Sequence, residues 1–350
     1  MDLKPISPIA AKAKEVEDHI KSDEPVLDPD YTPSKGSFIT RISTGSTLLD
    51  LGISGKRHPL GGIPGGVIVE MFGREGTGKT ALLMELLASV QAQGGEGEVL
   101  DPEARVDFEY SRTYGAKIPE EIYHRPDTVE EAFQYIRDKD YKPSTKPRIV
   151  GADSLAALST ALEMDKGDKM GMKRAKEFSA GFRTIARKIA NANVSLICTN
   201  QVREGDYGVT TPGGMAIRFY ASLRIQLRMT GKVEKEMKVF NSKVKKVLGI
   251  ETECEIVKST IDDPFRKAPI IIRFGYGVDD LAANLQWIKD IEASKTYNVG
   301  GKTYLSRDQA INYVEGNDLE KDIRNKVIAM WNEVEDTFAK ATSRKPKERV

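Results

Sequence analysis

The chain has 350 residues, with 53 lysines and arginines, 52 acidic residues and a formal net charge of +1. This length favours one main domain with appendages, and the charge balance excludes a uniformly basic protein, although a local basic stripe stays open. Two distant cysteines and three scattered histidines exclude a disulfide scaffold and a zinc pattern. No apolar run suits a membrane span or a signal peptide, so we expect a cytoplasmic protein.

Residues 1–36 are predicted to form an appendage. Apolar side chains recur at helical spacing over 9–21, where an amphipathic helix that docks on another surface and a frayed solvated helix both stay open. Residues 22–36 contain several prolines and are typical of a linker. A short strand at 38–42 and a helix capped by Ser46 or Thr47 are expected next.

Residues 73–80 read G-x-x-x-x-G-K-T, the pattern of a phosphate-binding loop. The apolar run at 67–72 predicts a buried strand before it, and 81–90 predicts a helix after it. Backbone N–H groups of such a loop converge on phosphates, and the helix dipole adds positive charge. We expect Lys79 to reach the β- and γ-phosphates and Thr80 to coordinate Mg²⁺. The predicted binding residues are Gly73, Arg74, Glu75, Gly76, Thr77, Gly78, Lys79 and Thr80.

Polar side chains follow three further predicted strands. Glu103 follows a strand at 98–101, Asp153 ends a strand at 148–153, and Gln201 follows a strand at 194–199. Side chains just past the carboxyl ends of parallel strands face the ligand crevice. We therefore expect Glu103 to orient a water at the γ-phosphate, Asp153 to support Mg²⁺ and Gln201 to sense the phosphate. From spacing alone, Glu103 as a solvated loop acid and Gln201 as an ordinary strand-end hydrogen-bonder stay open.

Two glycine-containing segments read as loops. Residues 162–173 precede a helix expected at 175–191, and residues 204–214 lack any periodicity. Arg218, Phe219 and Arg224 follow the second segment. Cations and an aromatic ring beside flexible loops suit a polyanion, although a solvated basic strand stays open.

The remaining chain predicts an exposed excursion, late strands and a small helical unit. Lysine-rich residues 232–250 favour a β-hairpin or another surface excursion, and the two segments 253–258 and 269–274 read as strands. Residues 281–340 form the helical unit, with helices at 281–291 and 318–338 and a hairpin at 299–304. The tail, 341–350, is basic and is predicted to be disordered.

Several motifs stand in a fixed order around the phosphate loop. They are Ile42-Ser43-Thr44-Gly45-Ser46, Gly61-Gly62-Ile63-Pro64, Asp101-Pro102-Glu103, residues 152–158, residues 199–203, Phe219-Tyr220-Ala221-Ser222 and Asp263-Pro264-Phe265. Through these motifs and their order, the chain closely resembles the RecA-type homologous recombinases. The resemblance runs from about residue 37 to the late 330s. The resemblance implies an α/β fold: an ATPase core over 37–280, with a mainly parallel twisted sheet flanked by helices. An N-terminal docking segment, 1–36, and a small α+β C-terminal domain, 281–340, would flank this core.

The resemblance also implies residue roles around ATP and Mg²⁺. Glu103 resembles the acid that activates water, with Lys79 and Gln201 beside it, and Asp153 the acid that supports Mg²⁺. Asp107 and Tyr110 stand where the family holds adenine, and Lys258 where it reaches ATP across a subunit interface. Loops at 162–172 and 204–214 would bind DNA, through Met170, Gly171, Arg174, Arg203, Gly213 and Gly214. The residues expected to couple the second loop to the interface are Arg218, Phe219 and Arg224.

The function implied is that of a DNA-dependent ATPase. It would form helical filaments on single-stranded DNA, pair with a homologous duplex and exchange strands in recombination and repair, with single-strand-binding or mediator proteins as possible helpers. Alternatives are a paralogue that binds ATP and DNA without exchanging strands, and a ring-forming helicase of the same fold. The chain departs from the family pattern at Thr260, which replaces a frequent second lysine, in a shorter second loop and in a basic tail.

Overall fold

The structure, a computed structural model, describes residues 39–142, 144–160, 171–205, 208–210 and 215–342. The described residues form two compact units, one ending at Asp280 and the other beginning at Leu281. The predicted N-terminal segment, 1–36, and all but two residues of the predicted basic tail lie outside the described ranges. No helix in these ranges has the length and apolar character that crossing a membrane requires.

A nine-stranded sheet runs through the first unit, in the order β13-β12-β11-β10-β3-β7-β6-β4-β5 among the described residues. The strands from β10 to β5 run parallel, whereas β11, β12 and β13 extend the sheet with antiparallel pairs. This sheet confirms the predicted α/β class. The strands are β3 (Ile68–Gly73), β4 (Glu96–Leu100), β5 (Tyr123–His124), β6 (Arg148–Ala152), β7 (Val194–Gln201), β10 (Leu223–Val239), β11 (Ser242–Ser259), β12 (Lys267–Arg273) and β13 (Gly277–Val278).

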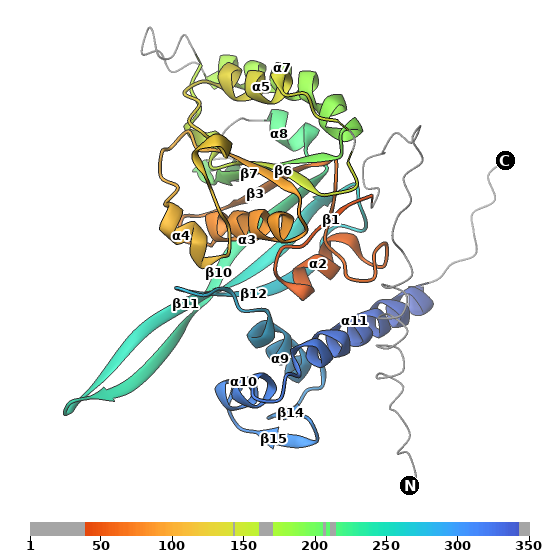
Figure 1. Cartoon of the computed structure of the whole chain (residues 1–350). Coiled ribbons are helices and arrows are strands. Elements are labelled where there is room, and N and C mark those ends of the chain that lie inside the picture. Colours follow the sequence, from red (N-terminus) through yellow and green to blue (C-terminus); the bar gives the residue numbers. More distant parts are fainter. Residues whose placement is uncertain (1–38, 143, 161–170, 206–207, 211–214, 343–350) are drawn as a thin grey trace, which may run out of the picture. The chain divides into compact units, whose positions relative to one another are not determined.

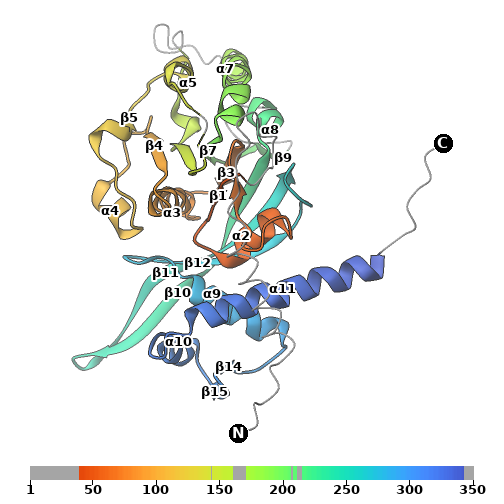
Figure 2. The same cartoon turned by 45° about the vertical axis from the view of Figure 1, so that its right-hand side comes forward.

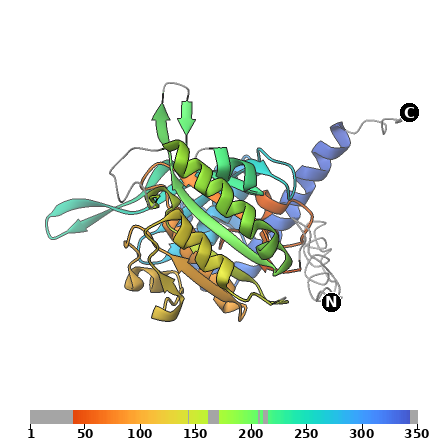
Figure 3. The same ribbon diagram turned by 90° about the horizontal axis from the view of Figure 1, so that it is seen from above.

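Helices cover both faces of the sheet (Figures 1 and 2). On one face lie α5 (Val129–Asp138), α7 (Gly171–Asn191) and α8 (Met215–Tyr220), and α3 (Lys79–Ala92) lies on the other. The view from above shows α5 and α7 side by side (Figure 3). Phe133 of α5 meets Phe182 of α7 edge-on, with ring centroids 4.9 Å apart. Gly181 permits this approach, because a Cβ there would lie 2.3 Å from the Phe133 ring.

Local signals explain the helix starts. The Thr128 hydroxyl accepts from the Glu131 amide and Glu131 reaches back, a capping box that begins α5. Ser46 caps α2 (Thr47–Ser54) by accepting from the Leu49 amide, as predicted. The short elements of this unit are β1 (Arg41–Ile42), β2 (Ile63–Pro64), α4 (Phe108–Thr113) and the 3₁₀ turns η1 (Glu120–Ile122) and η2 (Leu155–Ala157).

The structure differs from the sequence expectation at both predicted loops. Helix α7 begins at Gly171, four residues before the predicted start. Lys173 and Arg174 are good helix formers and are compatible with this earlier start. The segment expected to be irregular contains an antiparallel pair, β8 (Arg203–Gly205) and β9 (Gly208–Thr210). Residues 161–170, 206–207 and 211–214 lie outside the described ranges.

The predicted lysine-rich excursion is a long β-hairpin. Strands β10 and β11 pair from Leu223 and Ser259 out to Val239 and Ser242. Only the inner part has further partners: β3 pairs with 223–227 and β12 with 249–255. The outer part therefore leaves the sheet as a two-stranded arm, which Figure 1 shows projecting from the core.

The second unit combines helices with a small hairpin. It contains α9 (Asp280–Ile291, whose first residue belongs to the first unit), β14 (Tyr297–Val299), β15 (Lys302–Tyr304), α10 (Arg307–Glu315) and α11 (Glu320–Thr342). The predicted hairpin and two helices are present. Helix α10 was not predicted, although its capping box, Ser306 with Gln309, is readable in the sequence.

Candidate nucleotide-binding site

The phosphate-loop motif forms the turn between a buried strand and a helix. Gly73 ends β3, and α3 begins at Lys79 after Gly78, the N-cap, whose φ is 91°. A Cβ at Gly73 would lie 2.3 Å from the Leu227 carbonyl oxygen, so this position requires glycine. No side chain caps the start of α3. The first N–H groups of the helix are thus left for an anion.

Lys79 lies across the mouth of this turn. Its Nζ donates to the carbonyl oxygens of Gly73, at 3.0 Å, and of Arg74, at 2.8 Å. Burial lowers the pKa of Lys79, and the carboxylates of Asp153, Glu75 and Glu103 counteract this shift. A lysine desolvated in this way gains most from an anionic partner, which suits a phosphate contact.

Thr80 and Asp153 meet at the next position. The Thr80 hydroxyl donates to Asp153 Oδ2 at 2.7 Å, and the Thr199 hydroxyl donates to the other carboxylate oxygen. Burial raises the pKa of Asp153, against these two hydrogen bonds. A hydroxyl beside a buried carboxylate fits Mg²⁺. The described residues hold no cluster of three or more metal-binding side chains, so phosphate and water oxygens would supply the other ligands.

Glu103 lies beside this pair, on the turn after β4. The Ser154 hydroxyl donates to its Oε1 at 2.7 Å, and Arg105 pairs with its Oε2 at 2.8 Å. The turn is fixed by Asp101, a fully buried acid that accepts from the Val106 amide and the Tyr123 hydroxyl. Neither Ser154 nor Asp101 was assigned a role from the sequence, although both belong to motifs noted there.

Gln201 comes from the strand next to the loop. It is the last residue of β7, is exposed, and stands opposite Gly73 in the parallel register. The carboxyl ends of β3, β7, β6 and β4 are neighbours in the sheet. The four sequence-predicted positions, namely the loop, Gln201, Asp153 and Glu103, therefore gather at one edge.

The two residues expected at adenine have structural partners. Asp107 caps α4 by accepting from the amides of Glu109, at 2.8 Å, and Tyr110, at 3.0 Å. The Tyr110 ring is 43% exposed and meets Tyr114 edge-on, with the two hydroxyls 2.5 Å apart. Asp107 thus orients the helix that presents a partly exposed aromatic ring.

Lys258 lies toward the opposite end of the sheet. It pairs in register with Arg224, which in turn pairs with Glu70 near the start of β3. Lys258 Nζ donates to the carbonyl oxygens of Arg218, at 2.6 Å, and Phe219, at 3.0 Å, at the end of α8. The Phe219 side chain is 77% exposed. Lys258 thus binds the backbone at the end of α8, where Phe219 is exposed, at the end of the sheet opposite its own chain's phosphate loop.

Arg224 has a partner inside the core. Its Nε donates to Glu70 Oε2 at 2.5 Å, and its guanidinium lies over the Phe72 ring, 4.5 Å from the centroid. Glu70 is fully buried and also accepts from the Asn200 side chain at 2.9 Å. This network gives Arg224 a structural role that the sequence did not indicate.

Few of the residues predicted to bind DNA can be placed. Met170, Gly213 and Gly214 lie outside the described ranges. Gly171 is the first residue of α7, and Arg174 is half-buried in the first turn of that helix. Arg203 begins β8. The last two residues of the first predicted loop, 171 and 172, are therefore helical.

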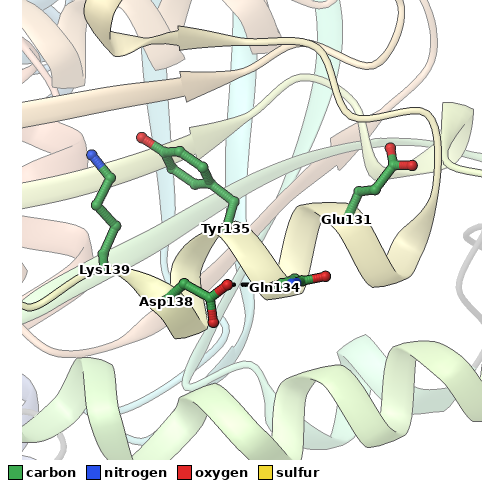
Figure 4. Close-up of a pocket in the computed structure, with 5 residues that line it drawn as sticks. All are labelled: Glu131, Gln134, Tyr135, Asp138 and Lys139. Carbon is green, nitrogen blue, oxygen red and sulfur yellow. Dashed lines mark hydrogen bonds between the residues drawn. The ribbon is translucent and has the colours of Figure 1, made fainter.

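A surface pocket on α5 lies apart from these residues. It is lined by Glu131, Gln134, Tyr135, Asp138 and Lys139 (Figure 4). Gln134 bonds Asp138 at 3.3 Å, and Lys139 leaves the pocket to pair with Glu98 at 2.9 Å. None of the predicted site residues lines it.

Comparison with known proteins identifies the family. The family model for the RecA N-terminal domain matches residues 31–279. "Protein RecA" of Delftia acidovorans is 32% identical over 301 residues, which cover 82% of this chain and 77% of the relative. "Protein RecA" of Azoarcus sp. is 33% identical over 304 residues, 83% of each chain. The chain belongs to the RecA family.

Proposed function

We propose that the protein is a DNA-dependent ATPase that forms helical filaments on single-stranded DNA and catalyses homologous pairing and strand exchange. The observation that carries this proposal is the meeting of Thr80, Asp153 and Glu103 at an uncapped helix start. This set would hold a magnesium nucleotide and aim an acid at its terminal phosphate. Membership of the RecA family supports the DNA-directed part of the proposal.

Within this proposal, each residue of the site has a distinct role. Lys79 and the loop amides hold the β- and γ-phosphates, and Thr80 with Asp153 would hold Mg²⁺, which supplies charge neutralisation on the phosphates. Glu103 accepts a proton from the attacking water, with Ser154 and Arg105 fixing its orientation. Gln201 contacts the γ-phosphate and couples nucleotide binding to the segment 204–214, which begins three residues later. Tyr110 contacts adenine.

The ATP site lies between protomers in this proposal. Lys258 cannot serve its own phosphate loop from the opposite end of the sheet, but it suits the loop of a neighbour stacked head to tail. The exposed Phe219 belongs to the same surface. A heterologous contact that does not close builds a filament. The segments 162–172 and 204–214 would then line its DNA path.

Electron microscopy with long single-stranded DNA tests the proposal. Continuous helical filaments are expected when DNA and a non-hydrolysable ATP analogue are both present, and the K79A variant is expected to form none. Closed rings on DNA would instead favour the helicase. DNA binding of equal affinity with and without nucleotide would contradict the proposed coupling between nucleotide binding and DNA binding.

A paralogue that loads or regulates another recombinase is the second candidate. Thr260 favours it, because a neutral side chain stands where the family frequently has a second lysine, two residues after Lys258. Such a protein would bind ATP and DNA and form filaments without producing joint molecules.

A further inference from the structure

The outer part of the β10–β11 hairpin is an arm with two unlike faces. Residues opposite each other in an antiparallel pair share a face. The register therefore places Glu236 with Lys245 and Lys238 with Lys243 on one face, and the residue pairs Met237–Val244, Val239–Ser242 and Lys235–Lys246 on the other. The first face carries ion pairs: Lys243 with Glu236 at 3.1 Å and Lys245 with Glu234 at 2.5 Å.

The second face is apolar and exposed. Met237 is 58% exposed, Val244 47%, Val239 44% and Phe240, at the tip, 95%. A two-stranded hairpin without a third strand or a helix over it is marginally stable in water. Interfaces concentrate methionine and aromatic side chains at their centre. An apolar face of this kind on an arm with no other strand beside it is therefore expected to be covered.

The charges define the chemistry of the covering surface. On the apolar face, Lys235 and Lys246 lie opposite each other, next to Met237 and Val244. DNA would suit these two lysines but not the apolar side chains beside them. The second face instead suits a protein surface that is apolar at its centre and acidic at its rim.

The direction in which the arm leaves the sheet indicates which protein covers its apolar face. Strand β10 runs parallel to β3 with Leu227 opposite Gly73, so the arm leaves the sheet at the same end as the phosphate loop. The base of the arm touches that loop, because the Thr252 hydroxyl donates to the Thr77 carbonyl oxygen at 3.1 Å. In the proposed filament this end faces the next protomer. The far end of the sheet exposes acidic and aromatic side chains, including Asp263 and Phe265.

We infer that the apolar face of this arm, Met237, Val239, Phe240 and Val244, docks on a second copy of the chain. The inference rests on the proposed function, since that function puts a neighbour at the phosphate-loop end. The length is adequate: about ten residues per strand reach roughly 33 Å, whereas a core of this size has a radius of gyration of roughly 18 Å. The arm thus spans a large part of a neighbouring core.

Photocrosslinking of the full-length protein tests the inference. The variant Phe240→p-benzoylphenylalanine is irradiated with single-stranded DNA and an ATP analogue, and mass spectrometry identifies the adducts. A covalent dimer of the chain is expected, with far less from Lys243→p-benzoylphenylalanine on the ion-paired face. Adducts to DNA in place of dimers, or no dimers, would overturn the inference. Dimers without filaments in the microscope would refute the proposed function alone.

A second measurement does not depend on the photoreactive residue. The double variant Met237→Ser with Val244→Ser is expected to need a roughly tenfold higher protein concentration for assembly, because two buried apolar side chains are lost. The matched control is Glu234→Ser with Lys245→Ser, which removes an ion pair from the other face and should assemble like the parent. Equal assembly of the two double variants would contradict docking through the apolar face.

Discussion

The Thr80 hydroxyl donates to Asp153 Oδ2 across 2.7 Å, although the two residues are 73 positions apart. Thr80 is in the first turn of α3, the helix that follows β3, and Asp153 follows β6. The bond therefore joins the start of this helix to the end of β6, which is separated from β3 in the sheet by one strand, β7. Glu103 reaches the same place through Ser154. In the proposed function, this relationship adds to the phosphate-loop motif the acids that nucleotide hydrolysis requires.

Glu103→Gln separates binding from hydrolysis. Glutamine keeps the size of the side chain and can still accept from Ser154, but it cannot take a proton from water. ATP and DNA binding should persist while turnover falls by at least about 100-fold, the usual contribution of a general base. Turnover and nucleotide affinity are measured together, with the exposed Glu109→Gln as control. Loss of ATP binding itself would mean that Glu103 is structural.

Lys79→Ala removes the cation from the loop mouth. Turnover should fall by roughly 100-fold or more, as for other preorganised charge contacts, and nucleotide-dependent assembly should be lost. The control is Lys117→Ala. Lys117 is exposed and lies in the segment before β5, the strand at the edge of the sheet, away from the phosphate loop. An unchanged ATPase rate would refute the assignment of this site.

Arg224→Ala leaves the fully buried Glu70 without its cation. Breaking a buried pair from one side costs about 3–5 kcal/mol, so the variant should unfold at clearly lower denaturant concentration. Arg228, four residues along the same strand, pairs with Glu255 at 2.7 Å but is 48% exposed. Its change to alanine should cost less than about 1 kcal/mol. Equal losses for the two variants would show that the Glu70 network does not stabilise the core.

Glu85 links pH to stability. Burial raises its pKa from the ordinary 4.5 to about 7, while its hydrogen bond from the Val278 amide, 2.7 Å, opposes the shift. The folded state thus holds a proton that the unfolded chain releases above pH 4.5. This stabilisation is complete below that pH and is lost as pH rises through 7.

Glu85→Gln keeps an acceptor for Val278 and cannot ionise. Its melting temperature should match the parent near pH 4.5 and exceed it at pH 8. The gain should be on the order of 2 kcal/mol after allowance for partial exposure, or a few degrees. Thermal unfolding at several pH values measures the difference, and a difference independent of pH would contradict the raised pKa.

Short sequence motifs predicted the local structure of this molecule better than they predicted its long-range contacts. Residues 73–80 revealed the loop, the strand before it and the helix after it, because local geometry dictates those residue types. The α/β class followed from the resemblance to the RecA-type recombinases, which rests on several such motifs in a fixed order. The second loop was expected to be irregular, but β8 and β9 pair there, since glycine and threonine spacing does not reveal a short hairpin.

Two sets of contacts between distant residues had no sequence signal. Arg224 and Glu70 are 154 positions apart, and their pairing depends on the register of β10 with β3. The two faces of the hairpin arm likewise depend on the register of β10 with β11, which bulges shift more than once. A lysine-rich excursion was predicted, but not which side chains share its apolar face.

Joint-molecule formation tests the central claim most directly. The purified protein, single-stranded DNA and a labelled homologous duplex are mixed with ATP and Mg²⁺, and strand transfer is followed against a duplex of unrelated sequence. The account predicts transfer from the homologous duplex only, dependent on ATP binding and absent in the K79A variant. Filaments that bind ATP and DNA but yield no joint molecules would contradict it and favour the paralogue.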